Sequence, residues 1–185
     1  MASGTGVRQA LSAGTHRFFY ALWPEARVRA DLARAARRMH GALHGRRTPD
    51  ESIHLTLAFV GEVDRENLPR LLTPPADVST SAFSLALDEW GCWARSGIGW
   101  AAPSLIPAPL RDLAVNLEAW LRSSGFELEH RAFTPHVTLI RQAQCGPLAG
   151  VMTPIAWQVR EFALIRSRLA AGGAGYETIR AWPLT

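Results

Sequence analysis

The chain contains one short motif twice, and this repeat constrains its fold more than any other feature. The motif reads His-Leu-Thr-Leu at residues 54–57 and His-Val-Thr-Leu at residues 136–139, so the second copy begins a little under half a chain length after the first. His and Thr alternate with apolar residues in both copies, a period-two pattern that predicts a half-buried β-strand. Each predicted strand follows a helix pattern and a loop. The repeat therefore predicts two similar α+β lobes that face each other across a groove.

The rest of the chain supplies strand and helix patterns around the motifs. Strands are predicted at residues 17–22, 53–60, 83–87, 98–101, 136–141, 156–159, 161–168 and 176–182. Helices are predicted at 25–40, 65–72 and 109–123, a loop at 41–50, a turn region at 90–97 and a last hairpin turn at Gly172-Gly173. We expect a bilobal, pseudo-symmetric α+β fold, with two antiparallel sheets facing a central groove and helices on the outside. Residues 1–15 are predicted to be a flexible tail and residues 16–185 a single domain.

Composition excludes several enzyme classes and locations. Lys and Arg together number 20, and every one of them is Arg. Without lysine, the chain can form neither a Schiff base nor a lysyl–nucleotide intermediate, and it has no Walker-A lysine. No segment approaches the ~20 apolar residues of a membrane span, and the first residues lack the apolar core of a signal peptide. We therefore expect a cytoplasmic protein without a membrane partner.

The cysteines and the remaining histidines do not predict a metal site. Cys92 and Cys145 match no metal-ligand spacing, and in a reducing compartment we do not expect them to form a disulfide. The histidines outside the two motifs are His16, His40, His44 and His130. Their spacing specifies no zinc site. The sequence thus predicts no metal and no other cofactor.

The paired motifs carry the chemistry that the sequence predicts. On a strand, His and Thr two residues apart point to the same face, ~6–7 Å apart along the chain. An imidazole moves protons near neutral pH, and a threonine hydroxyl can donate a hydrogen bond to a phosphoryl oxygen. Two such strands would present His54, Thr56, His136 and Thr138 to one anion. One histidine would accept a proton from the attacking hydroxyl or water while the other protonates the leaving oxygen, which predicts metal-independent cleavage of a phosphodiester.

Other side chains are candidates for binding the phosphate and the base. Arg141, three residues after the second Thr, is the predicted phosphate-binding cation, and Arg46 and Arg131 are secondary candidates. The candidates for stacking on a nucleobase are Phe19, Trp93 and Phe133, and Tyr20 could also stack. Core packing explains each of these aromatic residues equally well.

The flanks of both motifs resemble those of a known family. IHLTLAFVGEV at 53–63 and AFTPHVTLIR at 132–141 are similar to the signature motifs of the bacterial RNA 2′,3′-cyclic phosphodiesterases. These are also called 2′-5′ RNA ligases or LigT-like proteins, and they belong to the two-histidine phosphoesterase superfamily. RFFYALWP resembles the family's opening strand, LALDEWGCWARSGIGW its middle hairpin and FALIRSRLAAGGAGYETIRAWPL its closing strands. The resemblance covers roughly residues 16–185 and implies a bilobal α+β fold with a central groove.

The resemblance also implies an activity and residue roles. The reaction would hydrolyse a 2′,3′-cyclic phosphate at an RNA 3′ end and leave a 2′-phosphate. By position, His54 would be the proton donor to the leaving O3′, and His136 would be the acceptor that activates water. Thr56, Thr138 and Arg141 would bind the phosphate. Family members also join and cleave 2′-5′ linkages without ATP, and the missing lysines exclude a lysyl-adenylate route to joining.

Some features depart from the family, and alternatives stay open. Ser52 stands where many relatives have Asn, and Arg47 where several have an aromatic residue, so the base-recognition loop is less well defined than the chemistry. One alternative is a phosphodiesterase acting on a small cyclic nucleotide such as ADP-ribose 1″,2″-cyclic phosphate. Another is a non-catalytic module that binds RNA or nucleotides. The expected partners are RNA 3′ ends or nucleotides with a 2′,3′-cyclic phosphate, and the chain is expected to be a monomer.

Overall fold

The computed structural model describes residues 16–78, 80–129, 132–170 and 173–185. The predicted tail at 1–15 lies outside the described residues, as do His130, Arg131 and Gly172. The helices are α1 (Ala26–Leu43), α2 (Leu68–Leu71) and α3 (Ala108–Ser123), with 3-10 turns at Asp50–Ser52 and Ala76–Val78. The strands are β1 (His16–Leu22), β2 (Arg46–Arg47), β3 (Leu55–Val63), β4 (Phe83–Leu87), β5 (Glu89–Trp93), β6 (Ile98–Ala102), β7 (Val137–Arg141), β8 (Ile155–Val159), β9 (Glu161–Ala170) and β10 (Gly173–Pro183).

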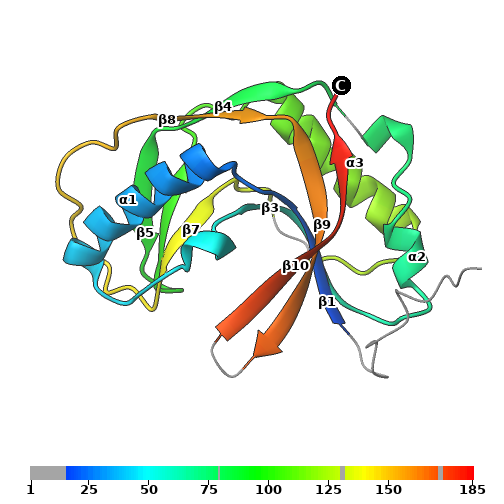
Figure 1. The fold of residues 1–185 in the computed structure, drawn as a ribbon, viewed down its shortest axis with the longest axis horizontal. Helices are drawn as coiled ribbons and strands as arrows, with labels where there is room; N and C mark the ends of the chain where they lie inside the picture. Colours follow the sequence, from blue (N-terminus) through cyan, green and yellow to red (C-terminus); the bar gives the residue numbers. More distant parts are fainter. Residues whose placement is uncertain (1–15, 79, 130–131, 171–172) are drawn as a thin grey trace, which may run out of the picture.

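Antiparallel pairing joins most strands into one sheet with the order β10-β9-β1-β3-β7-β6-β5, and β2 pairs with β7 (Figure 1). β4 and β8 form a second, two-stranded sheet. Within the described residues, Leu55–Val137 is the one register pair between the central strands β3 and β7. We call β10-β9-β1-β3 the first-motif half and β7-β6-β5 the second-motif half. The expected α+β class with antiparallel sheets is confirmed, and the two halves meet directly beside the motifs.

The two long helices pack in an exchanged arrangement. α1 precedes β3 in the chain but packs on β7, whereas α3 precedes β7 but packs on β3 (Figure 1). Both helices bury apolar residues at helical spacing, including Leu32 and Met39 of α1 and Leu113 and Leu117 of α3. Each helix thus packs on one half of the sheet, while the motif strand that follows it in the chain belongs to the other half. In the described part of the chain, no helix is long and apolar enough to span a membrane.

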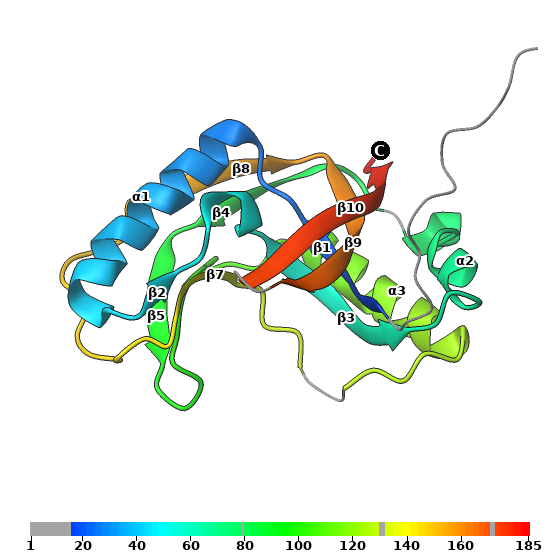
Figure 2. The ribbon, with the colours of Figure 1, turned by 60° about the horizontal axis from the view of Figure 1, so that its bottom comes forward.

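The large sheet has a packed face and an opposite face that carries both motifs. Leu55 and Val137 are fully buried in the main core, so alternation directs the His and Thr of each motif to the other side. We call that side the motif face. A smaller cluster there consists of Phe19, Ala21, Ala163 and Ile165, with Trp23 and Tyr176 packed against it. Pairing of Ala21 with Thr56 places this cluster on the motif face of the first-motif half, in which β9 and β10 follow β1 in the sheet order (Figure 2).

The segment between the first helix and the first motif differs from the prediction. α1 runs on to Leu43, because Met39 and Leu43 continue its apolar stripe and are fully buried. Part of the predicted loop at 41–50 is therefore helix. Another part is β2, whose Arg46 and Arg47 are exposed and carry no alternation that sequence reasoning could detect.

The predicted turn region at 90–97 is wrong over its first half. Residues Glu89–Trp93 form β5 and pair with β6. Glycine is needed at position 91 because the indole of Trp100 lies directly over its Cα and leaves no room for a Cβ. The predicted helix at 65–72 is also shorter, covering Leu68–Leu71.

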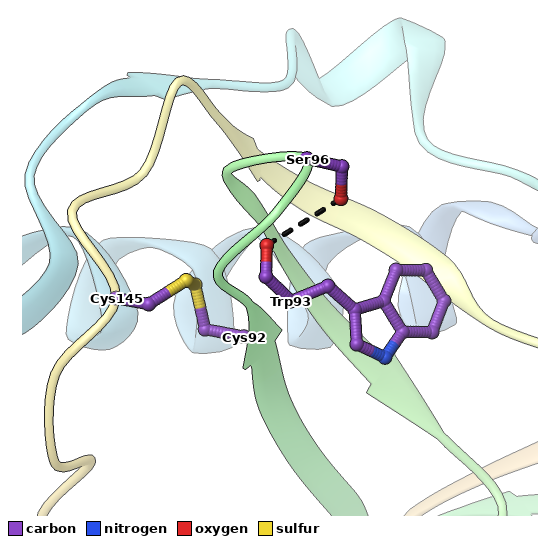
Figure 3. Close-up of a disulfide and its surroundings, with 4 residues drawn as sticks. All are labelled: Cys92, Trp93, Ser96 and Cys145. Carbon is purple, nitrogen blue, oxygen red and sulfur yellow. Dashed lines mark hydrogen bonds between the residues drawn. A yellow bond between two sulfur atoms is a disulfide. The ribbon is translucent and has the colours of Figure 1, made fainter.

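Cys92 and Cys145 form a disulfide, so the expectation that they stay unpaired is wrong (Figure 3). Cys92 lies on β5 and Cys145 follows β7, with their Cα atoms 5.5 Å apart, a separation that a disulfide bridges. The Ala143 N–H donates to the Gly97 carbonyl at 2.9 Å and holds this segment beside the β5–β6 hairpin. The expectation rested on the redox state of a compartment, whereas the proximity follows from the strand order β7-β6-β5.

Candidate active site

The two motifs meet at the junction between the halves of the sheet. His54 and His136 each lie one residue before a strand, and Leu55 and Val137, which follow them, are paired. Continuing this antiparallel register by one residue sets His54 opposite Thr138 and His136 opposite Thr56. All four side chains are half-buried. The structure thus brings the four predicted motif residues together on one face.

A β-bulge places Arg141 on the same face. Between β6 and β7, Trp100 pairs with Thr138 and Gly99 with Ile140, which leaves Leu139 as an extra residue on β7. The bulge shifts the alternation by one residue, so Leu139 and Ile140 are both fully buried and Arg141 points to the motif face. This geometry explains how Thr138 and Arg141, three positions apart, can contact one ligand.

β2 adds a second arginine next to the first. Its pairing with β7 sets Arg46 opposite Arg141 and Arg47 opposite Ile140. Arg46 therefore shares the motif face with Arg141, while remaining exposed to solvent. The secondary candidate Arg46 is close to the motifs, whereas Arg131 lies outside the described residues.

The two candidate catalytic histidines each make an equivalent hydrogen bond to the backbone. His54 Nδ1 is 2.7 Å from the Ser52 carbonyl oxygen, and His136 Nδ1 is 2.8 Å from the Thr134 carbonyl oxygen. Since a carbonyl oxygen only accepts, each Nδ1 carries the proton and donates it. In the neutral ring, Nε2 is then the free basic nitrogen of each histidine. The backbone of each motif thereby fixes the tautomer and orients the reactive atom.

Burial and positive charge keep both histidines neutral in the free protein. Burial is the main cause that lowers the pKa of His54, to about 4, with smaller contributions from Arg141 and His136. The His136 pKa is lowered mainly by burial and also by Arg141. The Arg141 charge therefore reaches both imidazoles. A bound anion would offset this charge and draw protons to the site.

The aromatic surroundings of the two histidines differ. Trp23 stacks parallel to His54, with ring centroids 5.1 Å apart and planes at 3°. Phe19 lies 4.9 Å from His54 in a tilted orientation, and Tyr176 meets it edge-on at 5.2 Å. Trp93 meets His136 edge-on at 4.6 Å. Within the described residues this is the one ring contact of His136.

The predicted stacking candidates lie in different environments, and the stacking role considered for Tyr20 is wrong because this residue is fully buried in the main core. Phe19 is 4% exposed and forms part of the wall around His54, so it has no open face for a base. Phe133 is half-buried and packs against the main core. Trp93 is half-buried beside His136, and its contact with Trp100 extends the aromatic surface at 5.5 Å. Trp93 is therefore the candidate with a surface open to a ligand.

Sequence reasoning missed Trp23 and Tyr176. Trp23 directly follows the apolar run of β1 and precedes Pro24, so the sequence indicates only that the strand ends there. Tyr176 reaches His54 through the pairing of β10 with β9 and of β9 with β1. No local pattern links positions so far apart in the chain. Over the residues that the structure describes, no three His, Cys, Asp or Glu side chains come close enough to hold a metal.

Comparison with known proteins identifies the family. The model of the family described as LigT like Phosphoesterase matches residues 22–100. An RNA 2′,3′-cyclic phosphodiesterase of Escherichia coli is 33% identical over 172 residues, covering 91% of this chain and 97% of that protein. The chain belongs to the LigT-like phosphoesterases. A Thermus thermophilus RNA 2′,3′-cyclic phosphodiesterase is 29% identical over 178 residues, covering 91% of this chain and 90% of the relative.

Solved structures of this family share the fold over most of the chain. E. coli LigT complexed with 3′-AMP superposes with a TM-score of 0.82 at 31% identity, covering 93% of this chain and 99% of that one. The family resemblance predicted from the motif flanks is thus confirmed. This LigT-like phosphoesterase carries two polarised histidines, two threonines and an arginine on one face, a set suited to acid–base cleavage of a phosphate ester.

Proposed function

We propose that this LigT-like phosphoesterase hydrolyses 2′,3′-cyclic phosphates at RNA 3′ ends and releases a 2′-phosphate. The observation that carries the proposal is the pair of histidines, each with Nδ1 bound to a carbonyl two residues earlier, at the single junction of the sheet halves. Acid–base cleavage needs two such proton carriers at one phosphorus atom. The names of the E. coli and T. thermophilus relatives support the same substrate.

The proposed reaction is an in-line displacement by water. His136 Nε2 accepts a proton from water as the water oxygen bonds to phosphorus. The bond from phosphorus to O3′ breaks, and His54 Nε2 donates its proton to O3′. After the step, His136 is protonated and His54 is neutral, and exchange with solvent restores the starting state. Thr56, Thr138 and Arg141 would hold the non-bridging oxygens as negative charge develops.

The charge balance of the site explains how the donor obtains its proton. In the free protein, burial holds the pKa of His54 near 4, so the ring is neutral at pH 7. An anionic phosphodiester offsets Arg141 and favours the imidazolium form. Proton uptake therefore accompanies substrate binding. Joining of 2′-5′ linkages would use the same groups with a hydroxyl in place of water, and its energy would come from the cyclic phosphate.

The test is incubation of the protein with an RNA ending in a 2′,3′-cyclic phosphate, with EDTA present. We expect a 2′-phosphate product, identified by ³¹P NMR. His40→Ala is the matched control for the motif histidines, because His40 is exposed and its ring bonds only to the Gly45 carbonyl within the described structure. A 3′-phosphate product or an EDTA-sensitive rate would contradict the proposal. Turnover of ADP-ribose 1″,2″-cyclic phosphate without turnover of RNA would favour the small-nucleotide alternative.

The cellular setting stays a prediction. The cytoplasmic location and the monomeric state are expected from the sequence. The Cys92–Cys145 disulfide is a feature more typical of an oxidising compartment.

A further inference from the structure

Three aromatic rings form a closed cluster around His54. Besides their contacts with the imidazole, Tyr176 meets Phe19 at 5.4 Å and Trp23 at 6.0 Å, both edge-on. Phe19 comes from β1, Trp23 from the residue after β1 and Tyr176 from β10. The rings hold one another as well as the histidine. We call Phe19, Trp23 and Tyr176 the aromatic enclosure.

The orientation of Trp23 is the informative detail. Its ring is parallel to the imidazole within 3°, whereas Phe19 is tilted by 31° and Tyr176 stands at 77°. The face of an indole is electron-rich and attracts a cation placed over it, and Trp does this best among the aromatic residues. A parallel stack also disfavours rotation of the imidazole out of the plane parallel to the indole. Trp23 therefore lies against one face of the His54 ring, where it can affect both the charge and the orientation of the imidazole.

A buried proton donor needs such support. Water is the usual partner of an imidazolium ion, and burial of His54 removes much of it. The charged and titratable groups whose field reaches His54 in the described structure are Arg141 and His136, and both disfavour its positive form. The Ser52 carbonyl favours the charged ring through Nδ1. The indole face of Trp23 is a second partner that favours the charged form of His54.

We propose that Trp23 is a positioning residue whose ring face supports the imidazolium form of His54 and holds Nε2 in the orientation for proton donation. This inference rests on the proposed function for the role of His54 as donor. The two histidines would then differ in role because of Trp23, a residue outside both motifs. His136, with an edge-on Trp93 contact and no stacked ring among the described residues, suits the neutral acceptor role.

The experiment compares Trp23→Phe with Trp23→Leu and Trp23→Met. Phe keeps an aromatic face, whereas Leu and Met keep an apolar side chain without one. We expect Trp23→Leu and Trp23→Met to lower kcat about 10-fold at nearly constant KM, and Trp23→Phe to lower it less than about 3-fold. The pKa of His54, followed by NMR with inorganic phosphate as the anion, should fall in the Leu and Met variants and stay near the original value in the Phe variant.

Controls separate this proposal from the proposed function. Trp90 is a half-buried indole that contacts Arg38 instead of a histidine, so Trp90→Leu should leave the His54 pKa unchanged. The NMR titration needs no turnover and therefore tests the enclosure even if the cyclic phosphate is not hydrolysed. Equal His54 pKa values in the Phe, Leu and Met variants would overturn the proposal. If the Leu variant does not fold, the Met and Phe variants decide it.

Discussion

The two halves of the sheet present the same His-x-Thr backbone in different surroundings. In both, Nδ1 of the histidine bonds to the carbonyl two residues earlier, at nearly equal distances. His54 lies among three aromatic rings. His136 makes an edge-on contact with Trp93 and lies close to β2 and β7, which carry Arg46 and Arg141. The repeat supplies two equivalent proton carriers, and the neighbouring strands make them unequal. If His54 gives and His136 accepts the proton, as we propose, residues outside the repeat would determine these roles.

The largest expected effect comes from deleting each histidine in turn. His54→Ala and His136→Ala should each lower kcat by about 10²–10⁴-fold with the natural substrate, since general acid and general base catalysis contribute by such factors. A substrate with sulfur in place of O3′ has a leaving group that needs no proton. With it, His54→Ala should recover to within about 10-fold of the unchanged protein, while His136→Ala should stay slow. Recovery of His136→Ala alone would reverse the two roles.

Arg141 tests whether one cation serves both halves. Arg141→Gln should lower kcat/KM by about 10²-fold, as expected for losing one donor to a developing anion. Its removal should also raise the pKa of both His54 and His136, because the arginine charge disfavours both imidazolium forms. NMR titration of the two ring signals measures this directly. A rise in the pKa of one histidine only would show that the Arg141 charge acts on one half of the sheet.

The pH profile sharpens the comparison further. Both pKa values lie below the ordinary histidine value, that of His54 at about 4, so the free protein loses its proton donor as pH rises. We expect kcat/KM to reach its maximum below pH 6.5 and to fall about 10-fold per pH unit above the higher pKa. Because bound substrate anion raises both pKa values, the kcat profile should lie at higher pH. Coinciding profiles would exclude coupled proton uptake.

The smallest expected effect on rate comes from the disulfide, which belongs to the second-motif half. Cys92→Ala with Cys145→Ala should lower kcat no more than about 3-fold, because Trp93 leaves β5 on the side opposite Cys92 (Figure 3). The free energy of unfolding should fall by up to about 4 kcal/mol, the chain-entropy value for cysteines 53 positions apart. Urea unfolding with and without reductant measures it. Equal midpoints would show that the bond does not stabilise the fold.

Local patterns predicted the catalytic face but not its surroundings. Alternation at 54–57 and 136–139 placed two His and two Thr on one side of two strands, and the structure agrees. The predicted Arg141 reaches that side only because Leu139 is an extra residue, and a bulge leaves no reliable trace in sequence. Tyr176 and the Cys92–Cys145 pair depend on strand order, which links distant residues through other strands. At the site, the features that were not predicted are thus non-local, whereas the ends of α1 and α2 and the start of β5 were local errors.

The Leu55–Val137 pair has a mechanical consequence. Within the described structure it is the one rung of backbone pairing between β3 and β7, and it lies next to both histidines. A small rocking of one half against the other would pivot near this rung. Groups close to a pivot move little, while the outer strands β10 and β5 at the two edges of the sheet would move over a larger arc (Figure 2). Any such motion would therefore leave the spacing of the two imidazoles nearly unchanged.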